Sequence, residues 1–167
     1  MPGRVAQDWG SGVNSALPDA PFGTGHSHGG MYVSTAVETV ISVQSTPTKA
    51  LGTTTVSAYL EDFEMSANNR LTYLGRQTSH FHVAVALSMT SAANIQVTSM
   101  TIGKNGTSLP ETEIQRKIGT GTDVGAVAVV GLVELAKDDY LEMFVANETS
   151  TGNLTVEFMN FTASEVG

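Results

Sequence analysis

The stretch GLVELAKDDYLEMFVANETSTGNLTVEFMNFTASE, from Gly131 to Glu165, decides the fold. Its apolar run at 132–135 leads into 136–139, where lysine and aspartate side chains suit a tight turn. The segment 140–146 is aromatic, β-branched and rich in methionine, as pleated strands are. After a loop of small polar residues, apolar and polar side chains alternate from Leu154 onward. The stretch therefore predicts three consecutive strands.

Working outward, the rest of the chain repeats this pattern of short strands and turns. The cleanest alternation places Phe81, Val83, Val85, Leu87 and Met89 on one face, which we assign to the core. A strong hairpin signal, Asn105-Gly106, ends another strand. No long helix is indicated, and the best helical candidate, 110–117, is explained equally well as a strand. The upstream strands are expected at 31–44, 53–60, 80–89, 95–104 and 111–118.

The segment from Val124 to Val133 is apolar on both faces. One face has Val124, Ala126, Ala128, Val130 and Leu132, and the other has Val127, Val129 and Val133. A strand that is apolar on both faces is normally covered on both. In a two-sheet sandwich the partner sheet covers one face. The second cover is the N-terminal segment or another copy of the chain, unless the strand lies in the middle of a single barrel.

These pieces together resemble the jelly roll of the C1q and tumour-necrosis-factor type, most closely the version found in bacteriophage virion proteins. The resemblance rests on the order of the last three strands and on two upstream pieces, LTYLGRQTSHFHVAVALSM (71–89) and VTSMTIGKNGTSL (97–109). It covers roughly residues 70–166 and implies an all-β, two-sheet antiparallel jelly-roll sandwich, a domain that we assign to 31–167. It also implies homotrimers whose inner sheets pack together. We place Val127, Val129, Tyr140 and Phe144 at that subunit contact.

Residues 1–30 are interpreted as an extended anchoring arm. They hold three of the five prolines and much of the glycine, and their apolar residues follow no sustained period. Such a segment buries too little surface to fold alone. Large apolar groups in that setting often mark interfaces, so we expect Trp9, Leu17 and Phe22 to dock on a virion. A disordered leader, or a segment folded back on the domain, remains the alternative.

Composition excludes several classes of function. The net charge of −8 disfavours nucleic-acid binding, which needs a basic surface. The sequence has no cysteine, shows no signal peptide and has no window as long as a membrane span. We therefore expect no nucleic-acid or membrane partner, and we disfavour a secreted signalling ligand.

No constellation of residues indicates an enzyme. The chain lacks a G-x-S-x-G elbow and a phosphate-binding loop, and Glu61 and Asp62 would face opposite sides of a strand. His80 and His82 share a strand face and are the candidates if a metal is bound on a threefold axis. His26 and His28 lie among glycines and read first as a flexible hinge. We expect no cofactor and no metal.

The sequence-based hypothesis is a trimeric structural protein on the exterior of a phage virion. The arm would attach it to the major capsid protein or another virion protein, as a decoration, cement or head-fibre protein. The alternative is a tail-fibre or receptor-binding module that recognises a host surface ligand. In both cases we expect the protein to act by binding a partner.

Overall fold

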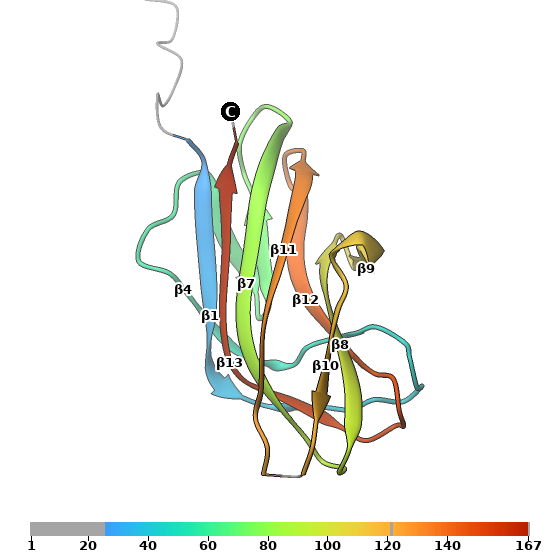
Figure 1. The fold of residues 1–167 in the computed structure, drawn as a ribbon. Coiled ribbons are helices and arrows are strands. Elements are labelled where there is room, and N and C mark those ends of the chain that lie inside the picture. The colour runs from blue at the N-terminus through green and yellow to red at the C-terminus, as the bar shows by residue number, and fades with distance from the viewer. Residues whose placement is uncertain (1–25, 121, 167) are drawn as a thin grey trace, which may run out of the picture.

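The computed structural model describes residues 26–120 and 122–166, which form two antiparallel sheets packed face to face (Figure 1). Sheet A has the strand order β11-β7-β13-β1-β4, with the short β2 paired to β13. Its strands are β1 (His28–Ala36), β2 (Glu38–Thr39), β4 (Gly52–Val56), β7 (Ser79–Ser91), β11 (Gly125–Leu135) and β13 (Leu154–Glu165).

Sheet B has the strand order β10-β8-β12-β6-β5, with β3 paired to β12 and β9 paired to β8. Its strands are β3 (Thr48–Lys49), β5 (Phe63–Ala67), β6 (Arg70–Tyr73), β8 (Gln96–Lys104), β9 (Thr107–Ser108), β10 (Ile114–Ile118) and β12 (Tyr140–Asn147). A single turn of 3₁₀ helix, η1 (Pro110–Thr112), precedes β10. The chain crosses repeatedly between the sheets, so strands distant in sequence lie side by side, and the predicted all-β jelly roll is confirmed.

The core lies between the sheets and is built from alternate residues of each strand. The face predicted for β7, from Phe81 to Met89, is buried there as expected. Phe63 and Tyr73 from sheet B pack against Phe81 of sheet A, with ring centroids 5.2 Å and 4.9 Å from that of Phe81. The rings meet edge to face, with interplanar angles of 86° and 64°, a favoured geometry for aromatic pairs. They join the two sheets close to where the chain enters the domain.

The entry of the chain into the domain differs from the prediction. β1 begins at His28, so the last residues of the predicted arm belong to sheet A and pair with the end of β13. The glycines there allow close packing and do not form a hinge. A Cβ at Gly29 would lie 2.6 Å from Phe63, and one at Gly30 would lie 2.9 Å from the carbonyl oxygen of Phe161.

Candidate binding face

Strand β11 leaves apolar side chains on the outside of sheet A. Its odd-numbered residues point into the core, and Val129 is 1% exposed. Its even-numbered residues point outward: Val130 is 58% exposed and Leu132 is 68% exposed. The sequence therefore predicted correctly that this strand is apolar on both faces. Among the described residues, the exposed face is the one that contains Val130 and Leu132.

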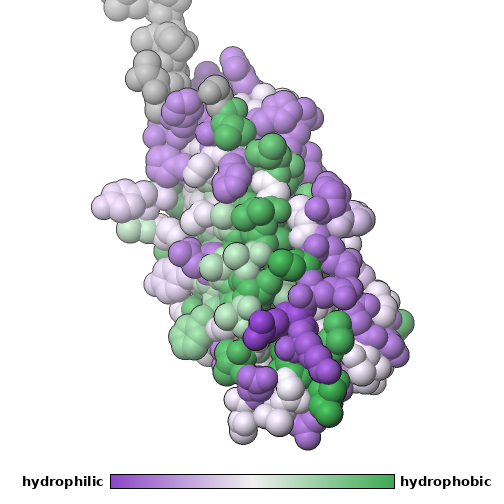
Figure 2. Space-filling model, viewed as in Figure 1, coloured by the Kyte–Doolittle hydropathy of each residue, from purple (hydrophilic) through white to green (hydrophobic). Residues whose placement is uncertain are grey.

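The neighbouring strands extend this outer face across the middle of sheet A with uncharged side chains, most of them small. In register, Ala128 lies opposite Ala86 of β7, which lies opposite Asn160 of β13, which lies opposite Tyr32 of β1. One step along, Val130 lies opposite Ala84, which lies opposite Thr162. Figure 2 shows hydrophobic residues gathered in the middle of this face, with hydrophilic residues at its margins. We call this surface the A face.

Two aromatic side chains border a groove on the A face. A register shift between Val156 and Phe158 marks a bulge in β13, and Phe158 is 73% exposed beside it. Bulges commonly redirect a side chain out of the regular ladder. Tyr32 lies on the adjacent strand β1. Together with alanine and serine residues of β7 and β11, the two rings line an open groove of about 640 Å³. An exposed apolar groove of this kind is typical of an interaction surface.

The four residues predicted for the subunit contact do not meet on one surface. Val129 lies in the core and Val127 is partly buried against it. Phe144 and Tyr140 belong to β12 of the other sheet, where the Phe144 ring lies so close to Gly103 that a Cβ there would overlap it. The subunit contact itself stays a prediction. On the A face, Tyr32, Val130, Leu132 and Phe158 are exposed and apolar.

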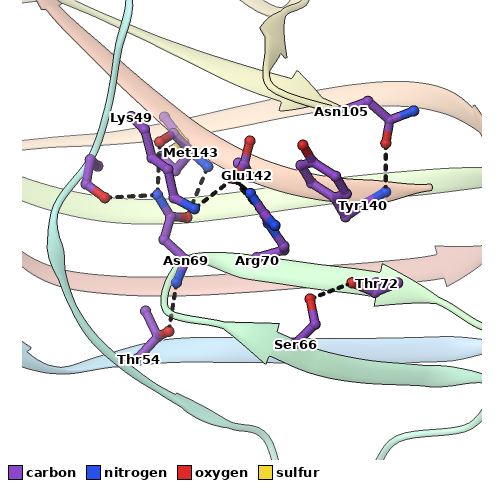
Figure 3. A network of polar contacts seen from close by, with 11 residues as sticks. Lys49, Thr54, Ser66, Asn69, Arg70, Thr72, Asn105, Tyr140, Glu142 and Met143 are labelled. Carbon is purple, nitrogen blue, oxygen red and sulfur yellow. Dashed lines mark hydrogen bonds and ion pairs between the residues drawn. The ribbon is translucent and has the colours of Figure 1, made fainter. Parts of the chain in front are cut away.

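At strand β12, the outer face of sheet B is covered by the chain itself. Glu142 projects there and is 1% exposed, because the Lys49 ammonium lies 2.6 Å and the Arg70 guanidinium 3.3 Å from its Oε1 (Figure 3). Arg70 also stacks over the Tyr140 ring, at 4.0 Å from the centroid. A buried carboxylate is tolerated when it is paired in this way.

Asn69 links three segments beside that ion pair. It is 2% exposed and adopts a left-handed backbone conformation with φ of 50°. Its side-chain nitrogen donates to the carbonyls of Ala50 and Met143, and its Oδ1 accepts from Met143 N–H (Figure 3). Asparagine suits the position because it tolerates this conformation and satisfies buried backbone groups.

The residue at the root of the predicted arm is held at one end of sheet A. Ser27 is 4% exposed; its N–H donates to Glu165 Oε2 at 2.8 Å, and its hydroxyl donates to Asp62 Oδ2 at 2.9 Å. Hydrogen bonds from Ser79 and from Ser27 N–H hold the pKa of Glu165 below its ordinary value. The hinge interpretation is therefore wrong for residues 27–30, which are held by these contacts and by β1; Thr24 and Gly25 lie outside the described residues. Trp9, Leu17 and Phe22 lie outside the described residues.

The histidines and acids do not gather into a metal-binding group within the described part of one chain. His80 and His82 lie on β7, and the Nε2 atom of His80 is 3.5 Å from Glu134 Oε2. No group of three or more histidine, aspartate or glutamate residues in the described ranges could hold a metal ion. Across 26–120 and 122–166 we also find no helix with the length and apolarity of a membrane span.

Comparison with known proteins finds likeness of fold alone. No family model matches the chain, and no curated protein matches it. The solved structure of Eiger TNF from S. frugiperda aligns with a TM-score of 0.55 at 9% identity, over 85% of this chain and 93% of that one. Murine APRIL at pH 5.0 aligns with a TM-score of 0.51 at 10% identity, over 81% and 98%. The chain therefore has a jelly-roll fold of the tumour-necrosis-factor type.

Proposed function

We propose that the chain is a structural virion protein that assembles as a homotrimer through the A face and binds a capsid through its N-terminal arm. The observation that carries the trimer is the A face itself, which combines exposed apolar side chains with a lack of charge at its centre. Interfaces between subunits are depleted of charge and enriched in aromatic residues at their core. Tyr32 and Phe158 fit that description.

The placement of the arm root supports attachment by avidity. Ser27 is fixed beside the end of β13, so the arms of a cyclic trimer would all leave from the same end of the assembly. Three arms that engage one surface bind far more tightly than one, because the second and third contacts are intramolecular. The virion as the target rests on the resemblance of the sequence to phage virion proteins and on the composition of residues 1–30.

Light scattering at micromolar concentration tests the assembly: a trimer has about three times the mass of the 17.5 kDa chain. A monomer at that concentration contradicts the trimer.

Cosedimentation with purified capsids tests attachment. Deletion of residues 1–25, which spares β1, should abolish cosedimentation and leave the trimer intact. Trp9→Ala should weaken it, since a buried tryptophan anchor commonly contributes about 2 kcal/mol or more.

Receptor binding is a second candidate, favoured by the loops at the end of the sandwich opposite Ser27. There, Ile95 N–H donates to Gly119 O and Ser45 N–H donates to Asn147 O, which brings together loops from both sheets. Val40, Val43 and Ile95 are exposed among them. Cosedimentation of the protein with host cells, lost on Ile95→Lys but retained after deletion of 1–25, would favour this function over capsid attachment.

A further inference from the structure

The hairpin between β8 and β9 contains the one Asn-Gly pair of the chain, Asn105-Gly106. Both residues are exposed and have positive φ, 52° and 79°, as a tight two-residue hairpin turn requires. Asn-Gly is also the dipeptide most prone to deamidation, because glycine leaves its own backbone nitrogen unhindered. That nitrogen attacks Cγ of the asparagine and expels ammonia to close a succinimide, which water then opens to aspartate or isoaspartate.

The fold holds both ends of the Asn105 amide. Its Nδ2 donates to Asp139 Oδ1 at 2.6 Å, and its Oδ1 accepts from Tyr140 N–H at 2.9 Å. The orientation of the amide is fixed by these partners, since a carboxylate only accepts and a backbone N–H only donates. Asn105 N–H donates to Tyr140 O at 3.0 Å, so the side chain completes the hydrogen-bond ladder where β8 turns away from β12.

Asp139 is itself anchored on two further sides. Its Oδ2 accepts from Ala136 N–H at 2.9 Å and lies 2.9 Å from Lys104 Nζ. Burial alone would raise the pKa of Asp139, but the hydrogen bonds from Asn105, Lys104 and Ala136 outweigh it and lower the pKa. The carboxylate is therefore an ionised, immobile acceptor for the Asn105 amide, which joins the β8–β9 hairpin to the turn between β11 and β12.

We propose that Asn105 is a deamidation site. In the folded chain its side-chain hydrogen bonds to Asp139 and Tyr140 slow the reaction, and the deamidated product cannot form the same contacts. To reach Gly106 N, Cγ of Asn105 must rotate, and rotation breaks both side-chain hydrogen bonds. After deamidation to aspartate, a carboxylate oxygen replaces the Asn105 Nδ2 that donated to Asp139 Oδ1. The two negative charges then repel each other. Isoaspartate adds a backbone methylene and no longer fits the turn.

Peptide mapping by mass spectrometry, with aspartate and isoaspartate resolved, tests the site after incubation at mildly alkaline pH. We expect Asn105 to deamidate at least about tenfold more slowly in the folded chain than in urea. Breaking one hydrogen bond to a charged group is enough to slow the reaction by about that factor. Asp139→Ala should restore most of the fast rate under native conditions. Lys104→Met is the matched control: it removes the ion pair to Asp139 but neither hydrogen bond of the Asn105 side chain, so its rate should stay slow.

Equal rates in the folded and urea-unfolded chain would overturn the proposal. A folded Asp139→Ala chain with the wild-type rate would also overturn it, as would a Lys104→Met chain that reacts as fast as Asp139→Ala. Circular dichroism establishes that each variant is folded. Asn105→Asp, which imitates one product, provides a second readout that needs no incubation. Its melting temperature should be about 2–4 °C lower than that of the wild-type chain. An unchanged melting temperature would contradict the claim that the deamidated product loses these contacts.

Discussion

The outer faces of sheets A and B are both formed by antiparallel strands, but they differ in how their side chains are covered. Over β12 of sheet B the chain covers its own surface: Lys49 and Arg70 pair with Glu142, and Asn69 is hydrogen-bonded to Met143. On sheet A the corresponding surface is left apolar and open, with Phe158 and Leu132 exposed. Polar contacts within the chain stabilise the isolated chain. An exposed apolar face contributes favourable free energy only when another surface buries it.

Two phenylalanines give the most direct test of this difference. Phe144 is buried on the outer side of sheet B and Phe158 is exposed on the A face. Phe144→Ser should lower the free energy of unfolding by about 3–5 kcal/mol at every protein concentration, because it leaves a cavity over Gly103. If the proposed trimer forms through the A face, Phe158→Ser should instead shift its dissociation to a higher protein concentration. Urea unfolding and light scattering over a hundredfold dilution series separate the two, and similar behaviour of both variants would refute the contrast.

Asn69 provides the next largest effect. Asn69→Ala removes the partners of buried backbone groups of Ala50 and Met143 and places alanine in a left-handed conformation. Each unsatisfied group costs about 1–3 kcal/mol, so we expect a loss of about 3 kcal/mol in the free energy of unfolding. Gln115→Ala, on the exposed strand β10, is the matched control and should change it by less than about 0.5 kcal/mol. Chemical denaturation at a fixed protein concentration measures both.

The architecture was predictable from sequence because strand period and turn chemistry are local signals. The alternation at 80–89 and the turn at 136–139 each specify a side-chain face or a reversal without reference to the rest of the chain. The side of β11 that stays open was not predictable. Both of its faces are apolar, and only the packing of sheet B over Val129 decides which one is covered.

Glycine and polar residues were harder to interpret for a related reason. Gly29 and Gly30 are required by the close approach of Phe63 and Phe161, which are distant in sequence, so composition alone suggested a hinge. Glu142 looks like a surface residue in an alternating strand. Its burial depends on Lys49 and Arg70, which reach it from two other strands. Long-range partners of this kind leave no local pattern.

The ion pair of sheet B should respond asymmetrically to substitution. Replacing both cations, Lys49→Met with Arg70→Met, leaves the Glu142 carboxylate buried without a partner and should cost about 2–3 kcal/mol, below the full penalty because the cations are partly exposed. Replacing the acid, Glu142→Gln, leaves two cations that can turn to water and should cost about 1 kcal/mol. Equal losses in urea unfolding would show that the carboxylate is not desolvated as the structure indicates.

The smallest expected effect is at the arm end of sheet A. The pKa of Glu165 is lowered in the folded chain by hydrogen bonds from Ser79 and Ser27 N–H. A lowered pKa means that the ionised group stabilises the folded state above its unfolded pKa, about 4.3, and that this contribution is lost as the pH falls through the folded pKa. The group lies near the surface, so the contribution is about 0.5 kcal/mol.

Glu165→Gln should therefore reduce the free energy of unfolding near neutral pH and match the wild-type chain in acid, once Glu165 is protonated in both states. Urea titrations of the two proteins at a series of pH values measure the difference directly, and Glu157→Gln, at the other end of β13, controls for the loss of one charge. A difference that persists unchanged into acid would mean that the substitution acts through packing. The Ser27 contacts would then owe nothing to the charge of Glu165, and the arm root would be held by the backbone pairing of β1 with β13 and by the hydrogen bond from Ser27 to Asp62.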